Sequence, residues 1–105
     1  MNYRVTIRPQ AQLDILEIWS FIAEAQLQPL VAERWLDGIE RAIASLQRLP
    51  RRGRVVHVEF LGRESGVRQI LFHNHRIFYT VAEREVAVLH VRRGTQQLRR
   101  SGPSA

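Results

Sequence analysis

The chain has 105 residues, 45% of them hydrophobic, and its 16 arginines, no lysine and 10 acidic residues give a net charge of +6. This length predicts a single domain, and no apolar run approaches the roughly 18 residues of a membrane-spanning helix, so we expect a cytoplasmic protein without a membrane partner. The lack of cysteine excludes disulfides and thiolate metal sites, and the lack of lysine excludes Schiff-base catalysis. The positive charge favours an acidic partner, either nucleic acid or an acidic protein segment, although GC-rich codons would equally explain the missing lysines.

The first residues predict a strand and then a helix. Residues 3–8 alternate apolar and polar side chains, which is typical of a half-buried strand. Pro9 suits the first turn of a helix, and Asp14 lies near the helix start, where the macrodipole favours negative charge. The apolar positions of this helix recur every three or four residues at Ala11, Ile15, Ile18 and Ile22, widened by Trp19 and Ala25.

A second helix is expected from Pro29 to the break at Pro50 and Gly53. Its apolar stripe consists of Val31, Trp35, Ile39, Ala42, Leu46 and Leu49, flanked by Leu36 and Ile43. Because the connection between the two helices is short, we expect them to form an antiparallel helical hairpin.

The second half of the chain predicts four strands. They cover residues 55–61, 67–72, 76–81 and 86–91, with breaks at 62–66, 73–75 and 83–84 that are short enough for antiparallel connections. The last strand is almost continuously apolar, which predicts burial on both faces. We therefore expect an α+β fold in which an N-terminal strand and an α-helical hairpin pack on a twisted, mainly antiparallel β-sheet. This domain would span residues 1–97, followed by a basic, disordered tail at residues 98–105.

No motif points to catalysis or to a metal. His73 and His75 stand two residues apart in a predicted turn, which is a weak metal-like spacing without a third ligand, and solvation of the turn is the simpler interpretation. The sequence contains no glycine-rich phosphate loop, no His-Glu-x-x-His and no nucleophile elbow. We therefore expect no catalytic residue, no bound metal and no cofactor.

The arginines are the main candidates for a binding site. Arg68 and Arg76 lie on neighbouring predicted strands joined by a tight turn at residues 73–75, so we expect them to converge on one face of the sheet. Arg92 and Arg93 end the last strand. Such a set can bind a phosphodiester backbone or an acidic peptide. The alternative for each single arginine is that it only solvates a strand edge and so discourages aggregation.

Three apolar side chains of the first helix fall outside its apolar stripe, namely Leu13, Leu16 and Phe21. In a two-layer domain only one side of a helix faces the sheet, so these side chains predict a groove for an interaction partner. The alternative is that the second helix covers some of them.

Several short motifs, taken in order, resemble the RelE/ParE toxins of bacterial type II toxin–antitoxin modules over residues 3–97. They are Ala11-x-x-Asp14-Ile15-x-x-Ile18, the second helix followed by Leu49-Pro50-x-x-Gly53, Gly66-Val67-Arg68, Arg76-Ile77-Phe78-Tyr79 and Val88-Leu89-His90-Val91-Arg92-Arg93-Gly94. The last of these motifs is similar to the ParE form of the final strand. The resemblance implies the same α+β fold.

The resemblance implies one of two activities. RelE-type members are ribosome-dependent mRNA endonucleases that use several basic residues and usually a late tyrosine or histidine, and Arg68 and Arg76 match two of the basic positions. Ile70 and Gln96 stand where other basic residues are expected, and no tyrosine follows Tyr79. In-line attack on a phosphate needs charge stabilisation and proton transfer, so these departures favour the ParE-type activity, which is non-enzymatic inhibition of DNA gyrase.

The resemblance also implies the partners. A cognate antitoxin of the ribbon-helix-helix type would neutralise the toxin and provide its only connection to operator DNA. Its amphipathic segment would cover Leu13, Leu16 and Phe21, and its acidic segment would lie on the arginines. The alternatives are a RelE-type mRNA endonuclease and a non-toxic corepressor that acts with its antitoxin.

Overall fold

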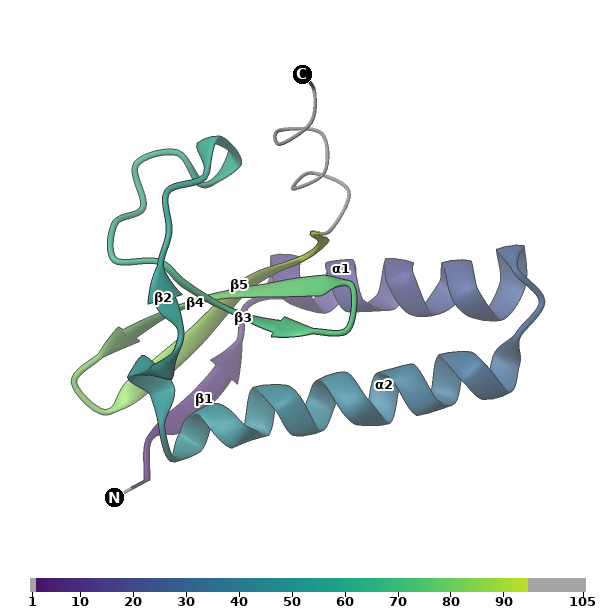
Figure 1. The fold of residues 1–105 in the computed structure, drawn as a ribbon, viewed down its shortest axis with the longest axis horizontal. Coiled ribbons are helices and arrows are strands. Elements are labelled where there is room, and N and C mark those ends of the chain that lie inside the picture. Colours follow the sequence, from purple (N-terminus) through teal and green to yellow (C-terminus); the bar gives the residue numbers. More distant parts are fainter. Residues whose placement is uncertain (1, 95–105) are drawn as a thin grey trace.

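The computed structural model describes residues 2–94, so the predicted tail and the end of the predicted domain lie outside the described residues. Its elements are, in chain order, β1 (Arg4–Ile7), α1 (Pro9–Ser20), a π-helical turn (Phe21–Ala25), α2 (Pro29–Ala44), 3-10 turns (Ser45–Gln47 and Pro50–Arg52), β2 (Arg54–Val55), a 3-10 turn (Glu59–Leu61), β3 (Arg68–Phe72), β4 (His75–Ala82) and β5 (Glu85–Arg93). Figure 1 shows α1 and α2 as an antiparallel hairpin beside the sheet. No helix within residues 2–94 is long and apolar enough to cross a membrane.

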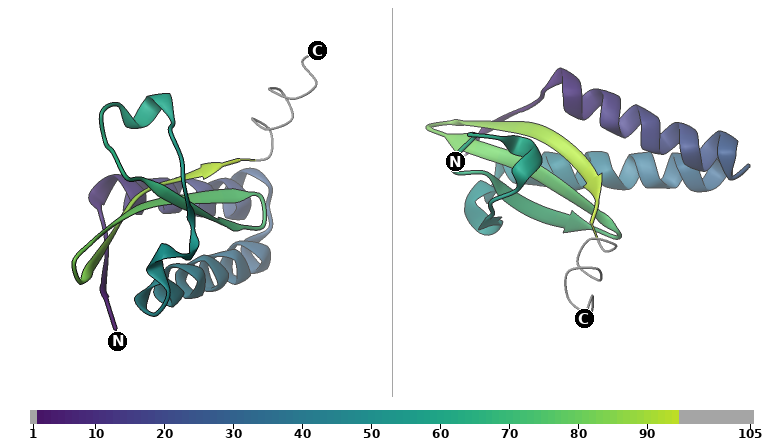
Figure 2. Two further views of the ribbon diagram at one scale, coloured as in Figure 1. Left: turned by 60° about the vertical axis from the view of Figure 1, so that its left-hand side comes forward. Right: turned by 90° about the horizontal axis from the view of Figure 1, so that it is seen from above.

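The strands form one mixed sheet with the order β1-β5-β4-β3-β2. β2 to β5 are an antiparallel meander, whereas β1 runs parallel to β5 with Val5 opposite Val86. A parallel pair needs a long crossover, and here the crossover contains the helical hairpin and the strands β2 to β4. Seen from above, both helices lie on one side of the sheet (Figure 2). The predicted α+β fold with a mainly antiparallel sheet is therefore confirmed.

The main core lies between the helical hairpin and the sheet. Its buried residues are Ala11, Trp35, Ile39, Ile43, Leu46, Ile77, Tyr79, Val86, Val88 and Val91. The predicted stripe of the second helix is right at Trp35 and Ile39 but wrong at its ends, since Val31 is 45% and Leu49 66% exposed. α2 ends at Ala44, so Leu49 no longer follows helical spacing, and Val31 lies in the first turn, near the tip of the hairpin.

A smaller core lies on the other face of the sheet. Its buried residues are Val67, Phe78 and Leu89, and the apolar side chains that cover them include Val56, Val58, Phe60 and Leu61. The predicted strand over residues 55–61 is therefore wrong, since β2 ends at Val55 and Glu59–Leu61 is a 3-10 turn. The alternating apolar residues of this segment cover a sheet face instead of extending the sheet edge. β5 is buried on both faces as predicted, because Val88 belongs to the main core and Leu89 to the smaller one.

Asp14 joins α1 to the last strand. Its side chain is buried, and Oδ2 accepts a hydrogen bond of 2.9 Å from the backbone N–H of Val91. β1 pairs with β5 only as far as Val88, so the carboxylate satisfies a β5 donor beyond the end of β1. Nδ1 of His90 lies 3.4 Å from the same oxygen. The predicted interaction of Asp14 with the helix macrodipole is wrong, since the first turn contains no acidic residue and Asp14 instead connects helix and sheet.

Candidate functional site

The register of the β3–β4 hairpin places Arg68 and Arg76 on opposite faces of the sheet. The turn has two residues instead of the expected three, so Arg68 lies opposite Tyr79 and Arg76 lies opposite Leu71. Opposite residues share a face and neighbours along a strand alternate. Arg68 therefore faces the helices together with Tyr79, whereas Arg76 faces away from them together with Phe78. The expected convergence of Arg68 and Arg76 on one face is wrong.

Arg68 holds the loop that follows α2. Its Nη1 donates to the carbonyl oxygen of Gly53 at 2.6 Å and to that of Arg51 at 3.2 Å. Beside it, the hydroxyl of Tyr79 donates to the carbonyl of Pro50 at 2.6 Å and accepts from the N–H of Gly53 at 3.1 Å. Burial raises the pKa of Tyr79, so the phenol stays protonated at neutral pH. The guanidinium of Arg68 thus organises the backbone of this loop.

On the face away from the helices, Arg76 and Arg92 lie directly opposite each other on β4 and β5. They form part of an open depression of about 830 Å³, here called the arginine cleft, which is lined by His57, Val58, Glu59, Phe60, Arg76 and Arg92. The guanidinium of Arg76 lies 4.7 Å from the ring centroid of Phe78, and that of Arg92 lies 4.1 Å from the centroid of Phe60. Each guanidinium is therefore stabilised by a cation–π interaction with an aromatic ring.

The charges of the arginine cleft suit an anionic ligand. Nε of Arg76 donates to Oε1 of Gln69 at 2.8 Å, which orients the side chain. Burial and then the charge of Arg54 lower the pKa of Arg76. Like charges directly opposite each other on neighbouring strands are destabilising, so a phosphate or carboxylate between Arg76 and Arg92 relieves this repulsion. Glu59 is the single acidic residue of the lining, so the two arginines leave the cleft with a net positive charge that favours an anion.

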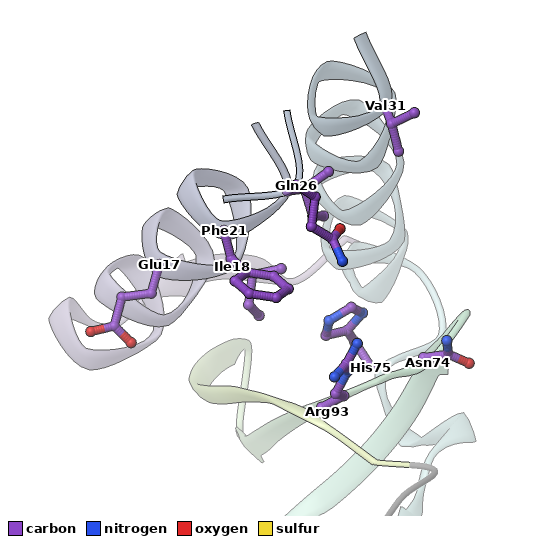
Figure 3. Close-up of a pocket in the computed structure, with 9 residues that line it drawn as sticks. Glu17, Ile18, Phe21, Gln26, Val31, Asn74, His75 and Arg93 are labelled. Atoms are coloured by element: carbon purple, nitrogen blue, oxygen red, sulfur yellow. The ribbon is translucent and has the colours of Figure 1, made fainter. Parts of the chain in front are cut away.

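A second depression, here called the hairpin groove, lies between the tip of the helical hairpin and the β3–β4 turn (Figure 3). Its volume is about 460 Å³, and it is lined by Glu17, Ile18, Phe21, Ile22, Gln26, Val31, Asn74, His75 and Arg93. This volume falls in the range of about 300–1,000 Å³ that is usual for ligand sites. The helices contribute mainly apolar side chains, whereas the sheet contributes His75 and Arg93, which lie opposite each other on β4 and β5.

The structure separates the three apolar residues that were expected to form one groove. Phe21 lines the hairpin groove, but Leu13 and Leu16 do not. Leu13 and Leu16 lie one helical turn apart on the outer side of α1 and are 54% and 58% exposed. The molecule therefore presents two apolar surfaces, one on the outer side of α1 and one at the groove.

The two arginines at the end of β5 are also separated. As neighbours on one strand, Arg92 and Arg93 point to opposite faces, so that Arg92 lines the arginine cleft and Arg93 lines the hairpin groove. Of the four arginines predicted as one basic surface, the cleft contains Arg76 and Arg92. Each depression therefore has its own cationic group.

His75 was expected only to solvate a turn, but it is the first residue of β4 and lines the hairpin groove. Nε1 of Trp35 donates to its Nδ1 at 3.3 Å, and the two rings meet edge to face. Burial, followed by the charges of Arg93 and His73, lowers the pKa of His75, so the ring is neutral at pH 7. Because Nδ1 accepts a hydrogen bond, the proton is on Nε2. Among residues 2–94 no three His, Asp or Glu side chains are grouped as metal ligands.

Other site residues were not predicted from the sequence. Phe60 belonged to a predicted strand, although it supports Arg92 in the cleft. Leu27 and Leu30, at the tip of the helical hairpin, are 81% and 72% exposed. Two leucines beside Pro29 in a helix connection could have indicated this exposed apolar surface from the sequence, because polar residues are usual in such turns.

The sequence matches the family described as ParE toxin of type II toxin-antitoxin system, parDE, over residues 5–98. A chain of the chromosomal ParDE TA system from P. aeruginosa is similar in structure, with a TM-score of 0.72 and 18% identity over 88% of this chain and 96% of that chain. A chain of the toxin-antitoxin complex RelBE2 from Mycobacterium tuberculosis has a TM-score of 0.59 and 21% identity over 89% of this chain and 99% of that chain. A chain of the YoeB dimer from Staphylococcus aureus has a TM-score of 0.54 and 19% identity over 88% of this chain and 97% of that chain. No curated protein sequence is significantly similar.

Proposed function

Because the chain belongs to the ParE family of toxins of type II toxin–antitoxin systems, we propose that it arrests growth by binding DNA gyrase in the cytoplasm, without catalysis. The family match over residues 5–98 is the observation that carries this proposal. A cognate antitoxin of the ribbon-helix-helix type neutralises the toxin and connects it to operator DNA. The antitoxin contacts the exposed apolar side chains of α1 and the arginines of the sheet.

The placement of the basic residues supports binding rather than catalysis. Arg68 and Arg76 match two basic positions of the nucleases, but Arg68 is hydrogen-bonded to two carbonyl groups on the helix-facing side of the sheet. Ile70 packs against the main core, so it contributes no charge to the arginine cleft. Gln96 lies outside the described residues. Phosphodiester cleavage needs several charged and proton-transferring groups around one phosphate. Of the described positions that were compared with the nucleases, only Arg76 lines the arginine cleft.

The second candidate is a RelE-type mRNA endonuclease. The arginine cleft is the observation that favours it, because Arg76 and Arg92 are suited to hold a phosphate beside the imidazole of His57. A third candidate, a non-toxic corepressor, requires only that the antitoxin-binding surfaces are intact.

Two assays with purified protein separate these candidates. In the first, the toxin is added to DNA gyrase with relaxed plasmid and ATP, and we expect slower supercoiling or accumulation of cleaved DNA. In the second, it is added to ribosomes translating a defined mRNA, and we expect intact mRNA. Codon-level cuts in the mRNA would overturn the proposal in favour of the endonuclease. Inactivity in both assays, with antitoxin binding retained, would leave the corepressor.

A pair of double variants tests the role of the arginine cleft at constant net charge. Arg76→Ala with Arg92→Ala and Arg63→Ala with Arg84→Ala each change the net charge from +6 to +4, since 6 − 2 = 4. Arg63 and Arg84 are exposed and lie outside the cleft. If the protein is an endonuclease, the cleft pair abolishes mRNA cleavage and the control pair does not. If mRNA cleavage depends only on the net charge of the protein, both pairs reduce it equally.

The outer side of α1 is tested by Leu13→Ser with Leu16→Ser. Removing two apolar contacts of about 1 kcal/mol each should weaken antitoxin binding about 10- to 30-fold. Both side chains are exposed, so the melting temperature should remain within a few degrees of the parent. Unchanged affinity together with a large fall in melting temperature would show that these leucines belong to the core.

A further inference from the structure

Three arginines lie on the face of the sheet that points away from both helices (Figure 2). Arg54 on β2 is opposite Gln69 on β3, and Gln69 is opposite the buried Phe78 on β4, so Arg54 shares this face with Phe78. Arg76 and Arg92 lie opposite each other on the same face, in the arginine cleft. Arg54, Arg76 and Arg92 are here called the arginine surface. The cleft is therefore part of a larger basic surface that reaches the β2 edge of the sheet.

The fold fixes the position of Arg76. Its aliphatic stem lies where a Cβ atom of residue 94 would be, so the glycine at this position leaves room for it. Nε donates to Gln69 at 2.8 Å, and the guanidinium lies 4.7 Å from the ring centroid of Phe78. A side chain that only solvates a strand edge does not require these contacts. They hold the cation in one place, which lowers the entropy cost of binding a ligand.

Arg92 is held in a similar way by Phe60. Its guanidinium lies 4.1 Å from the centroid of the Phe60 ring. That ring packs edge to face with Phe78 and His90, at centroid distances of 5.4 and 5.1 Å. Phe78 itself is fully buried. The aromatic rings therefore support the cations and do not provide a platform on which nucleobases stack.

Two cations of the arginine surface lack a carboxylate partner among residues 2–94. Neither Arg54 nor Arg92 forms an ion pair in this part of the chain, and of the described residues that line the cleft only Glu59 is acidic. At the other end of the sheet, by contrast, Arg4 pairs with Glu85 at 3.5 Å. The arginine surface therefore attracts a ligand with several negative charges.

The spacing of the arginines also requires several anionic groups. Three strand-to-strand steps separate Arg54 on β2 from Arg92 on β5, which amounts to about 14 Å at about 4.8 Å for each step. A single phosphate or carboxylate cannot reach both ends of this span. One strand of a DNA duplex has a phosphate about every 3.4 Å along the helix axis, so about four phosphates fall within it. Each planar guanidinium can bind a phosphate through two hydrogen bonds.

Single strands and acidic protein segments match this surface less well. Proteins that bind single strands combine a basic groove with aromatic rings for base stacking, and here the rings are used by the arginines. An amphipathic segment needs apolar side chains beside the cations. Val58 and Phe60 are the apolar residues of the described lining, and both already pack on the smaller core. Leu71, opposite Arg76 and 61% exposed, is the side chain that a protein segment would use in addition.

We propose that the arginine surface binds the phosphate backbone of duplex DNA, independently of the base sequence. The inference rests on the proposed function, because gyrase holds the duplex that the toxin contacts. The toxin then has two partners in one complex, the gyrase protein and the DNA bound to it. Contacts with phosphates alone carry no sequence information, so this surface does not select an operator.

Direct binding by the purified toxin tests the inference. Fluorescence anisotropy is measured with two labelled duplexes of about 20 base pairs, one AT-rich and one GC-rich, at about 50 to 200 mM salt. We expect the two duplexes to bind equally within about twofold. Three phosphate contacts give a slope of about −2.7 in the logarithm of the binding constant against the logarithm of the salt concentration.

The two double variants with a net charge of +4 separate local contacts from overall charge. Arg76→Ala with Arg92→Ala removes two of the three contacts and should bring the slope to about −0.9. Arg63→Ala with Arg84→Ala should keep it near −2.7, because both residues lie outside the cleft. Melting temperatures confirm that each variant is folded.

Two single variants leave the charge at +6. Gly94→Ala displaces the stem of Arg76 and should weaken duplex binding several-fold. Leu71→Ser should leave duplex binding unchanged, since a phosphate backbone gains nothing from a leucine side chain.

Four results would overturn the inference. The first is an equal loss of slope in the two double variants, and the second is a loss of duplex binding in Leu71→Ser. The third is tighter binding of a single-stranded RNA of the same length, and the fourth is tighter binding of a glutamate-rich peptide.

The gyrase assay keeps this inference separate from the proposed function. Gyrase inhibition by a toxin that does not bind the duplexes rejects the DNA contact alone. Duplex binding with the expected slopes, but without gyrase inhibition, rejects the proposed target alone.

Discussion

Replacing Asp14 with alanine should destabilise the fold far more than an ordinary exchange on a helix surface. The substitution removes the acceptor of the Val91 N–H, and Val91 is only 1% exposed, so the orphaned donor cannot recover a bond with water. A buried donor without a partner costs about 1–3 kcal/mol. Loss of the Gln10 hydrogen bond at 2.9 Å and of the contact with His90 adds a smaller amount. We expect the free energy of unfolding to fall by about 2–3 kcal/mol.

A fall of this size is large for a domain whose total stability is about 5–15 kcal/mol, and it corresponds to a shift of about 10–20 °C in melting temperature. Urea denaturation followed by tryptophan fluorescence measures the free energy. Asp37→Ala is the matched control, because Asp37 is exposed on α2 and gains the same helix propensity from the exchange. Hydrogen exchange at the Val91 amide locates the effect. If Asp14→Ala and Asp37→Ala agree within about 0.5 kcal/mol and the Val91 amide stays protected, the reasoning is refuted.

Three further substitutions probe the core and the groove. Tyr79→Phe leaves a buried carbonyl and N–H without partners and should cost about 1–3 kcal/mol in urea denaturation, whereas Tyr3→Phe, at an exposed hydroxyl, should cost far less. Gly38→Ala places a methyl group against a phenyl ring of β3, so it should lower the melting temperature although alanine is the better helix former. Because the folded pKa of His75 is lowered, stability should fall as pH drops from about 6.5 towards that value, and His75→Gln should flatten this dependence while His73→Asn does not. An unchanged slope in His75→Gln would assign the dependence to other groups.

Local patterns correctly predicted which sides of α2 and β5 are buried. The spacing of Trp35 and Ile39 identified the inner side of α2, and the continuous apolar run of β5 predicted burial on both faces. The segment 55–61 also alternates apolar and polar residues, yet it is not a strand. Alternation shows that one side is buried and does not show whether the backbone pairs with a neighbour, so the two cases look alike in the sequence.

The positions of the arginines depended on one residue of turn length. A three-residue turn at 73–75 would have placed Arg68 and Arg76 on the same face. The two-residue turn of the structure, with His73 at a φ of 53°, shifts the register by one and moves the whole set of side chains to the other face. The sequence pattern does not indicate the length of this turn, because a histidine rarely adopts positive φ and is a weaker indicator of a two-residue turn than glycine. The arginine cleft and the hairpin groove therefore became visible only with the register.

The pairing of the first strand with the last has a consequence for the order of synthesis. β1 and α1 emerge from the ribosome first, but β1 pairs with β5, and Asp14 binds a residue 77 positions further along the chain. Contacts between such distant residues close large loops and form late. A nascent chain that stops before Glu85 has neither the strand that β1 needs nor the donor that Asp14 holds. The toxin therefore cannot fold until nearly the whole chain has been translated. Incomplete products lack both the arginine cleft and the hairpin groove, because β5 contributes to each.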